Sequence, residues 1–165
     1  MILKSRFRFW AFLIVGSLGV LSSVLLLFFM LWIADVGAKV SVIALFATGL
    51  LSFTWLWLFL GELRTKAIAV KFEDGFISIK RFMGLVSSGV YPLKEFDGYK
   101  TCLLPSRSGY YEYLYLMKDG KKQVKLSQFY HSNYSEIKRF IAKEVTFLGK
   151  ESFSYRREIR EIFEF

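Results

Sequence analysis

The chain has 165 residues, a formal net charge of +9 and a hydrophobic content of 54%. Its one cysteine, Cys102, and its one histidine, His131, exclude an intramolecular disulfide and a zinc site of the usual histidine and cysteine type. The apolar residues are concentrated in the first third of the chain. A bilayer, rather than water, is the solvent that suits such a segment.

Two uncharged runs, residues 9–34 and 40–61, flank a loop over residues 35–39. A helix of about 20 apolar residues crosses the hydrocarbon core of a bilayer. Backbone amides in lipid must form their hydrogen bonds within the segment, which requires a helix. We therefore predict transmembrane helices over residues 9–34 and 40–61. A cleaved signal peptide is the alternative for the first run, but the apolar region of a signal peptide is normally much shorter.

Lysine and arginine residues flank the predicted hairpin on one side. Three of them lie in residues 1–8, three lie within ten residues after the second run, and the connecting loop has Lys39. The positive-inside rule then places both termini in the cytoplasm, with residues 1–8 as a basic cytoplasmic segment. We expect a multi-pass protein of the bacterial cytoplasmic (inner) membrane, whose first partner is the lipid bilayer.

Small side chains recur at helical spacing in both runs. They are Gly16, Gly19 and Ser23 in the first run, and Ala44, Thr48 and Ser52 in the second. Such faces allow close approach of two helices, either within the hairpin, where the two sets would meet, or between protomers. Neither run contains an ionisable residue, which argues against transport and intramembrane proteolysis.

The remaining residues alternate between apolar and polar positions, which is typical of strands. We predict strands over residues 66–72 and 76–80, joined by a turn at Asp74-Gly75, followed by strands over 85–93 and 96–104. Residues 105–109 are expected to form a loop.

A hairpin of residues 110–117 and 122–127 follows. A three-residue loop, 118–120, would place Leu114 and Leu116 on one face with Val124 and Leu126. The opposite face then has a row of tyrosines beside Lys125: Tyr111, Tyr113 and Tyr115. This row is either an interaction surface or is packed under the C-terminal segment.

A helix should begin after Asn133, with Glu136 completing a capping box. Its apolar stripe extends to Leu148, and Gly149 suits its end. Residues 150–165 form an amphipathic tail with three apolar residues on one side: Ile159, Ile162 and Phe163. A helix this short is marginal alone, so the tail needs a partner: the domain, the membrane surface or another subunit.

Residues that could carry out catalysis are sparse. His131 is predicted in the turn between strand and helix, and neither a P-loop nor a GxGxxG motif occurs. We expect no enzymatic activity, no cofactor, no metal and no nucleic acid. The remaining class is a binding or scaffolding protein.

Four segments carry a resemblance to a known family: Gly75 to Ile79, Tyr91 to Tyr99, Lys121 to Gln128, and Asn133 to Ile137. In them the chain resembles the bacterial PH-like (pleckstrin-homology-like) domain family, in its form with two membrane spans before the domain. The resemblance covers about residues 64–148. It implies a membrane α-hairpin plus an α+β domain over residues 64–149, a bent antiparallel β-barrel capped by a C-terminal helix.

The same resemblance bears on function. Pleckstrin-type domains that bind phosphoinositides carry basic residues at positions that match Lys71, Lys80 and Arg81, but here Glu73 and Asp74 occupy the adjoining loop and would repel a phosphate. We therefore expect a non-catalytic scaffold that joins a larger or homo-oligomeric membrane complex through protein partners. The alternative is a sensor of anionic lipid headgroups at the inner leaflet, which would use a set of five cations: Lys71, Lys80, Arg81, Lys121 and Lys122.

Overall fold

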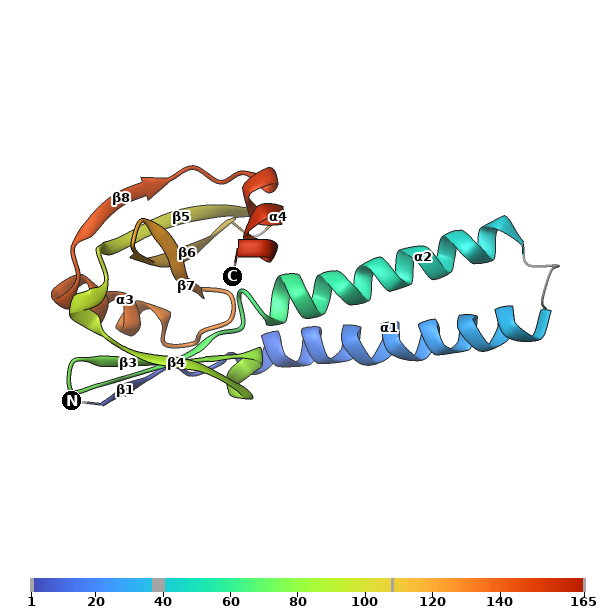
Figure 1. Ribbon diagram of the computed structural model, residues 1–165, viewed down its shortest axis with the longest axis horizontal. Helices are drawn as coiled ribbons and strands as arrows, with labels where there is room; N and C mark the ends of the chain where they lie inside the picture. Colours follow the sequence, from blue (N-terminus) through green and yellow to red (C-terminus); the bar gives the residue numbers. More distant parts are fainter. Residues whose placement is uncertain (1, 37–40, 108, 165) are drawn as a thin grey trace.

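The computed structural model describes residues 2–36, 41–107 and 109–164, and the side chains of all of these except Val36, Phe163 and Glu164. Two long helices, α1 (Phe9–Val36) and α2 (Val42–Leu56), project from a sheet-rich domain as an antiparallel pair, and α2 continues as a π-helix, η2 (Trp57–Leu63) (Figure 1). We call α1, α2 and η2 the apolar hairpin.

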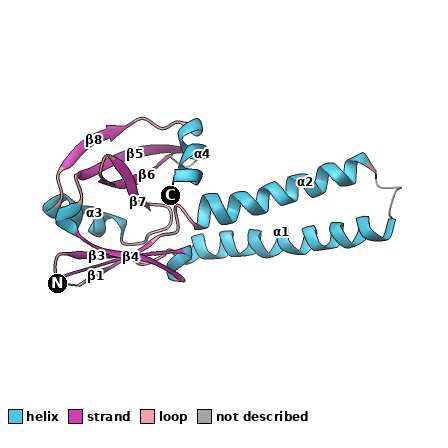
Figure 2. Cartoon of the chain, in the orientation of Figure 1, coloured by secondary structure: helices cyan, strands magenta, loops and turns pink. Residues whose placement is uncertain are grey.

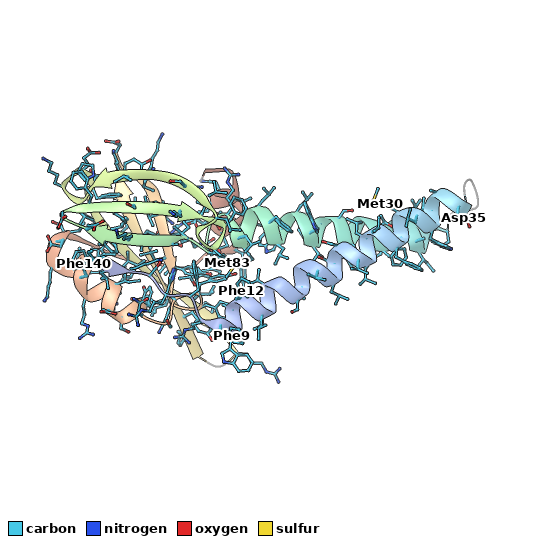
Figure 3. All side chains as sticks on the ribbon, turned by 90° about the horizontal axis from the view of Figure 1, so that it is seen from below. Phe9, Phe12, Met30, Asp35, Met83 and Phe140 are labelled. Carbon is cyan, nitrogen blue, oxygen red and sulfur yellow. The ribbon has the colours of Figure 1, made fainter. Side chains whose placement is uncertain are left out.

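The apolar hairpin is exposed rather than buried. Residues Phe9–Asp35 and Val42–Leu63 are long and apolar enough to cross a membrane, yet only 11% of the most apolar window of each is buried. Apolar side chains project outward along the hairpin from the domain to Asp35 (Figure 3). The two helices therefore differ from the core helices of a soluble protein, which bury their apolar side chains.

The domain contains two four-stranded sheets (Figure 2). The first has the order β1-β2-β3-β4 and consists of Leu3–Lys4, Ala69–Glu73, Phe76–Arg81 and Val86–Pro92. The second has the order β7-β6-β5-β8 and consists, in that order, of Lys121–Ser127, Gly109–Lys118, Gly98–Ser106 and Phe147–Glu151. Short 3-10 turns, η3 (Phe82–Gly84) and η4 (Leu93–Glu95), flank β4, and two helices follow β7: α3 (Tyr134–Glu144) and α4 (Tyr155–Glu164).

The core lies between the two sheets and α3. Alternate residues of β2 and β3, including Phe72 and Ile77, face Leu114, Leu116 and other residues of the second sheet, and all four are completely buried. Burial of each large aliphatic or aromatic side chain contributes about 1.5–3 kcal/mol. The predicted alternation in β2, β3, β6 and β7 is confirmed, since the apolar positions of each strand face this core.

The segment before the apolar hairpin also belongs to the domain. β1 pairs with β2 in the register Leu3↔Phe72, and the Ser5 amide donates to the carbonyl of Val70 at 2.8 Å. The Arg8 amide donates to the carbonyl of Tyr130 at 2.7 Å. Residues 1–8 were expected to be a separate basic segment. Instead, this segment adds a strand to the first sheet, because Leu3 is buried in the core while the neighbouring Lys4 is exposed.

The turn that joins β2 to β3 and the turn that joins β6 to β7 each place two residues in the left-handed region. Asp74 and Gly75 have φ values of 49° and 80°, and Asp119 and Gly120 have values of 51° and 71°, as in the two-residue turns that join hairpins. The predicted three-residue loop at 118–120 is therefore wrong. The predicted facing of Leu116 and Val124 is nevertheless correct, because a bulge opposite Leu116 and Met117 restores it.

Two predicted boundaries also differ. α3 ends at Glu144 rather than near Gly149, and β8 follows it, parallel to β5. The open edge of β5 accounts for this, since Tyr99 donates its amide to the carbonyl of Thr146 at 2.8 Å. β5 itself extends through Pro105 into the residues predicted as a loop. β8 crosses Gly98 so closely that a Cβ atom there would lie 2.4 Å from Cγ of Leu148.

Candidate functional site

Helix α4 covers the tyrosine row on β6. Tyr113 and Tyr115 are each 2% exposed, whereas Tyr111 is half-buried and stacks edge-on against Phe129 with ring centroids 5.4 Å apart. In Figure 1, α4 lies across the end of the second sheet, beside the domain end of the second helix of the apolar hairpin. Of the two alternatives for this row, packing beneath the C-terminal segment is the one found.

The apolar residues of the tail have different surroundings. Ile162 lies against η2, since a Cβ atom on Gly61 would be 3.3 Å from its Cδ1 atom. Ile159 is 49% exposed, and the side chain of Phe163 lies outside the described residues. The partner of the tail within the chain is therefore the domain together with the end of the hairpin.

Buried ion pairs join α4 to the second sheet. Lys125 on β7 is 1% exposed, and its Nζ atom lies 2.9 Å from Glu158 Oε2 and 2.7 Å from Glu161 Oε2. Lys122 pairs with Glu161 at 2.6 Å and with Glu151 at 2.9 Å. These lysines also lie over the tyrosine rings, with Nζ of Lys122 3.9 Å from the Tyr115 centroid, an arrangement that favours a cation.

The same contacts continue into the apolar hairpin. Lys66, just after η2, pairs with Glu62 of η2 at 2.5 Å and with Glu158 of α4 at 2.9 Å. Glu62 also accepts a hydrogen bond of 2.9 Å from the hydroxyl of Tyr130. An unbroken series of ion pairs therefore connects η2, β7 and α4. We call this set the junction network: Glu62, Lys66, Lys122, Lys125, Glu151, Glu158 and Glu161.

The junction network shifts the pKa values of its members in opposite directions. Burial alone would lower the pKa of Lys66, but Glu62, Tyr113 and Glu158 raise it above its ordinary value. Burial would likewise raise the pKa of Glu158, but Lys125 and Lys66 hold it below its ordinary value. Lys66 and Glu158 are therefore charged at neutral pH. The three lysines of the network, together with Arg157, which pairs with Glu151, match its four glutamates, which leaves little net charge for an external ligand.

His131 lies near this junction and is completely buried. Its Nδ1 atom is 2.9 Å from the carbonyl of Ser127, and its Nε2 atom is 2.8 Å from the carbonyl of Ile68. Burial lowers the pKa of His131, so the ring is neutral at pH 7. Both ring nitrogens face backbone carbonyls rather than a serine hydroxyl. The neutral ring has one N–H and donates to one of the two carbonyls, and it packs between β7 and the chain after η2. This contact is structural.

Asn133 has a role that differs from the predicted helix cap. Its side chain forms no capping hydrogen bond with α3. Its Oδ1 atom accepts from the Arg6 amide at 2.8 Å, and its Nδ2 atom donates to the Lys4 carbonyl at 2.9 Å. The asparagine thus fixes the segment that precedes the apolar hairpin. Sequence analysis missed this contact because the two segments are more than 120 residues apart.

The five cations predicted for lipid recognition do not form one surface. Lys122 belongs to the junction network, and together with Lys121 it lines a pocket of about 660 Å³ that also contains Lys100 and Arg160. Lys71 and Lys80 line a common pocket on the first sheet. The pKa of Arg81 is lowered by burial and by the nearby Arg64.

The small residues of α1 contact the end of the second helix of the hairpin. A Cβ atom on Gly19 would lie 3.3 Å from Leu58 Cδ2, and Trp55 Nε1 donates to Ser23 Oγ at 3.1 Å. A Cβ atom on Gly16 would have nothing within 4 Å. The sequence predicted that this set meets Ala44, Thr48 and Ser52. In the structure, Gly19 and Ser23 instead contact Leu58 and Trp55, which lie further along the second helix. Ala44 is itself buried, and Thr48 and Ser52 are half-buried.

The remaining reactive groups have little catalytic potential. Burial raises the pKa of the Cys102 thiol, which disfavours the nucleophilic thiolate. Within residues 2–36, 41–107 and 109–164, no group of three histidine, cysteine or acidic side chains is placed to hold a metal ion. Comparisons with protein-family models, with curated proteins and with solved structures gave no match.

Proposed function

We propose that the chain is a membrane-anchored, non-catalytic scaffold or interaction subunit of a larger or homo-oligomeric complex. The apolar hairpin would cross the bacterial cytoplasmic membrane twice, with both termini in the cytoplasm. The two-sheet domain would be PH-like and would face the inner leaflet. Two features support this placement: the apolar helices are exposed, and lysine and arginine residues flank the hairpin at its domain end.

One observation carries the proposal: both ends of the apolar hairpin are built into the domain. The segment before α1 adds β1 to the first sheet, and the segment after η2 enters the junction network. A domain that merely hung from a membrane anchor would need one flexible connection. Two fixed connections instead hold the domain in one orientation relative to the membrane, which suits a subunit that presents a surface to partners.

Membrane topology can be tested by labelling single cysteines in a Cys102→Ala background. Ser41 is exposed at the start of α2, and Ser135 is exposed on α3. We expect a membrane-impermeant thiol reagent to label Ser41→Cys in intact spheroplasts and to label Ser135→Cys only after permeabilisation. The reverse pattern, or release of the chain by alkaline carbonate, would refute the placement.

Scaffolding can be tested on the full chain, purified in mild detergent and, in parallel, in polymer discs that retain native lipid. We expect the protein mass, corrected for detergent or lipid, to be a multiple of one chain or to include a stoichiometric second protein. A homogeneous single chain in both preparations, without a partner, would contradict the scaffold.

The alternative of a headgroup sensor that uses all five predicted cations has less support, because Lys121 and Lys122 lie elsewhere. Lys71 and Lys80 remain together in one pocket, joined by Lys4, which sequence analysis had not included. This smaller set is the basis of the inference below.

A further inference from the structure

A basic pocket lies on the outer face of the first sheet. It has a volume of about 590 Å³ and is lined by one lysine from each of three strands: Lys4, Lys71 and Lys80. The strand register explains why they share a face, since Lys4 pairs with Lys71 and Lys80 pairs with Ala69, which also lines the pocket.

The charge of this pocket is only partly neutralised. Lys71 pairs with Glu73 at 2.5 Å. In the described part of the chain, Lys4 and Lys80 form no ion pair, and both are exposed. The pocket therefore has a surplus of positive charge, unlike the junction network, and is suited to an anion.

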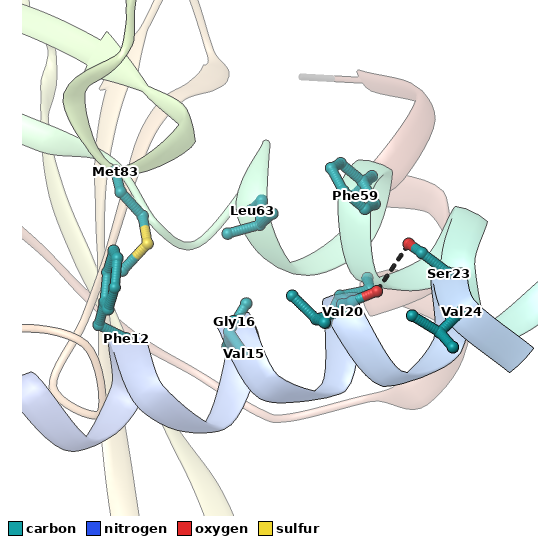
Figure 4. A pocket seen from close by; sticks show the side chains of 11 residues that line it. Phe12, Val15, Gly16, Val20, Ser23, Val24, Phe59, Leu63 and Met83 are labelled. Carbon is teal, nitrogen blue, oxygen red and sulfur yellow. Dashed lines mark hydrogen bonds between the residues drawn. The ribbon is translucent and has the colours of Figure 1, made fainter.

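An apolar groove lies beside this pocket, between α1 and η2 (Figure 4). Its volume is about 380 Å³, and its lining is almost entirely apolar, from Phe12 to Val24 on α1 and from Leu58 to Leu63 on η2. The twelve-residue rise from Phe12 to Val24 is about 18 Å, slightly more than half of a hydrocarbon core of about 30 Å. The groove thus has the length of one leaflet.

Met83 joins the two spaces, because it lines both the basic pocket and the apolar groove. Its side chain lies beside Phe12 at the base of the hairpin (Figures 3 and 4). Phe82 and Met83 have φ values of 51° and 57°, which are rare for residues with side chains. The Met83 amide donates to the carbonyl of Ala67 at 2.8 Å, which helps to hold this strained turn. Strained turns of this kind concentrate at binding sites.

We propose that the basic pocket and the apolar groove together bind one anionic phospholipid of the cytoplasmic leaflet. The phosphate lies between Lys4, Lys71 and Lys80, and one acyl chain lies in the groove beneath Met83. The inference rests on the membrane placement proposed above. An anionic lipid satisfies both halves of the site, whereas an apolar helix of a second copy would leave the lysines without counter-charge.

The direct test is a titration of the full chain with phosphatidylglycerol, and separately with phosphatidylcholine of the same acyl chains, followed by native mass spectrometry from detergent. We expect saturable binding of one phosphatidylglycerol and weaker binding of phosphatidylcholine. A double variant, Lys4→Ser with Lys80→Ser, should lower the phosphatidylglycerol affinity about thirtyfold at low salt. The matched control, Lys94→Ser with Lys143→Ser, removes two exposed lysines elsewhere on the domain and should change it little.

The groove is tested by Gly16→Leu, because a side chain there enters open space without a clash. This variant should lower the affinity for both lipids. In the parent chain, analogues with shorter acyl chains should dissociate faster than the two lipids, and Gly16→Leu should abolish this difference. Gly49→Leu is its control, since Gly49 on α2 also has nothing within 4 Å of a Cβ atom and lies outside the groove lining.

Any one of the following results would overturn the inference: equal affinity for the two lipids, an equal loss in the Lys94 and Lys143 control, or unchanged binding in Gly16→Leu. Binding of inorganic phosphate that competes fully with the lipid would show a site for a soluble anion instead, which also overturns it. Carbonate extraction distinguishes the two proposals. If the chain stays in the membrane after extraction but shows no selective lipid binding, this inference fails and the proposed membrane placement stands.

Discussion

The two sheets carry lysines in almost the same local sequence but in opposite surroundings. Lys71 lies between Val70 and Phe72 on β2, and Lys125 lies between Val124 and Leu126 on β7. Lys125 is 1% exposed beneath two glutamates of α4, whereas Lys71 borders an open pocket. The covering element, rather than the strand itself, therefore decides whether a lysine stabilises the fold or is available to a ligand.

The largest expected effect on stability comes from breaking the junction network beneath α4. Lys125→Met should destabilise the domain by about 3 kcal/mol, the lower end for breaking a buried ion pair. Glu158 and Glu161 each lose one of their two lysine partners and keep only Lys66 or Lys122. Thermal unfolding in mild detergent, followed by circular dichroism, would measure the loss. Adding Glu158→Met and Glu161→Leu should restore most of it, since apolar replacements leave no unpaired charge. An unchanged melting temperature in Lys125→Met would contradict the buried network.

A smaller effect is expected where α4 contacts the hairpin. Gly61→Leu should displace α4, because even a Cβ atom there would lie 3.3 Å from Ile162 and 3.6 Å from Trp57. Overpacking of this kind typically costs about 1–3 kcal/mol. Limited proteolysis of the tail should accelerate in this variant and should remain unchanged in Gly49→Leu. Equal protection of the tail in both variants would show that α4 does not depend on this contact.

Stability near the junction should also depend on pH through His131. Its folded-state pKa lies below its ordinary value because of burial, so the unfolded chain binds the proton more readily. The stability from the neutral ring is thus complete above about pH 6.5 and is lost as the pH falls below that value. The melting temperature should decline from pH 7 to pH 5 in the parent and less steeply in His131→Gln. Parallel slopes would refute this assignment.

The smallest effect on stability should come from the exposed lysines of the basic pocket. Lys4→Ser and Lys80→Ser remove exposed side chains without ion pairs among the described residues, so each should change the unfolding free energy by no more than about 0.5 kcal/mol. The same melting experiment measures this. A loss comparable to that of Lys125→Met would end the contrast between the two sets of lysines.

Local pattern predicted much of this architecture. The two apolar runs, the alternation of β2 and β3 around Asp74-Gly75 and the common face of Leu114, Leu116, Val124 and Leu126 all follow from spacing alone. Each of these features depends on residues that are close together in the sequence, where periodicity is informative.

The features that sequence analysis missed depend on contacts between distant segments. β1 is only two residues long and pairs with a strand more than 60 residues away. The junction network joins η2, β7 and α4, and the basic pocket joins Lys4 to Lys71 and Lys80. The prediction grouped Lys71, Lys80 and Arg81, taken from the family resemblance, with Lys121 and Lys122. Strand order, which separates the first group from the second, has no local signal in the sequence.

The central claim is that the domain is held in one orientation relative to the apolar hairpin. The most direct test is the distance distribution between spin labels at Ser17→Cys on α1 and Ser135→Cys on α3, in a Cys102→Ala background, measured by pulsed electron spin resonance in lipid bilayers. We predict a single narrow distribution that broadens when Glu158→Gln and Glu161→Gln are added. A broad distribution in the parent chain, unchanged by these substitutions, would contradict the account.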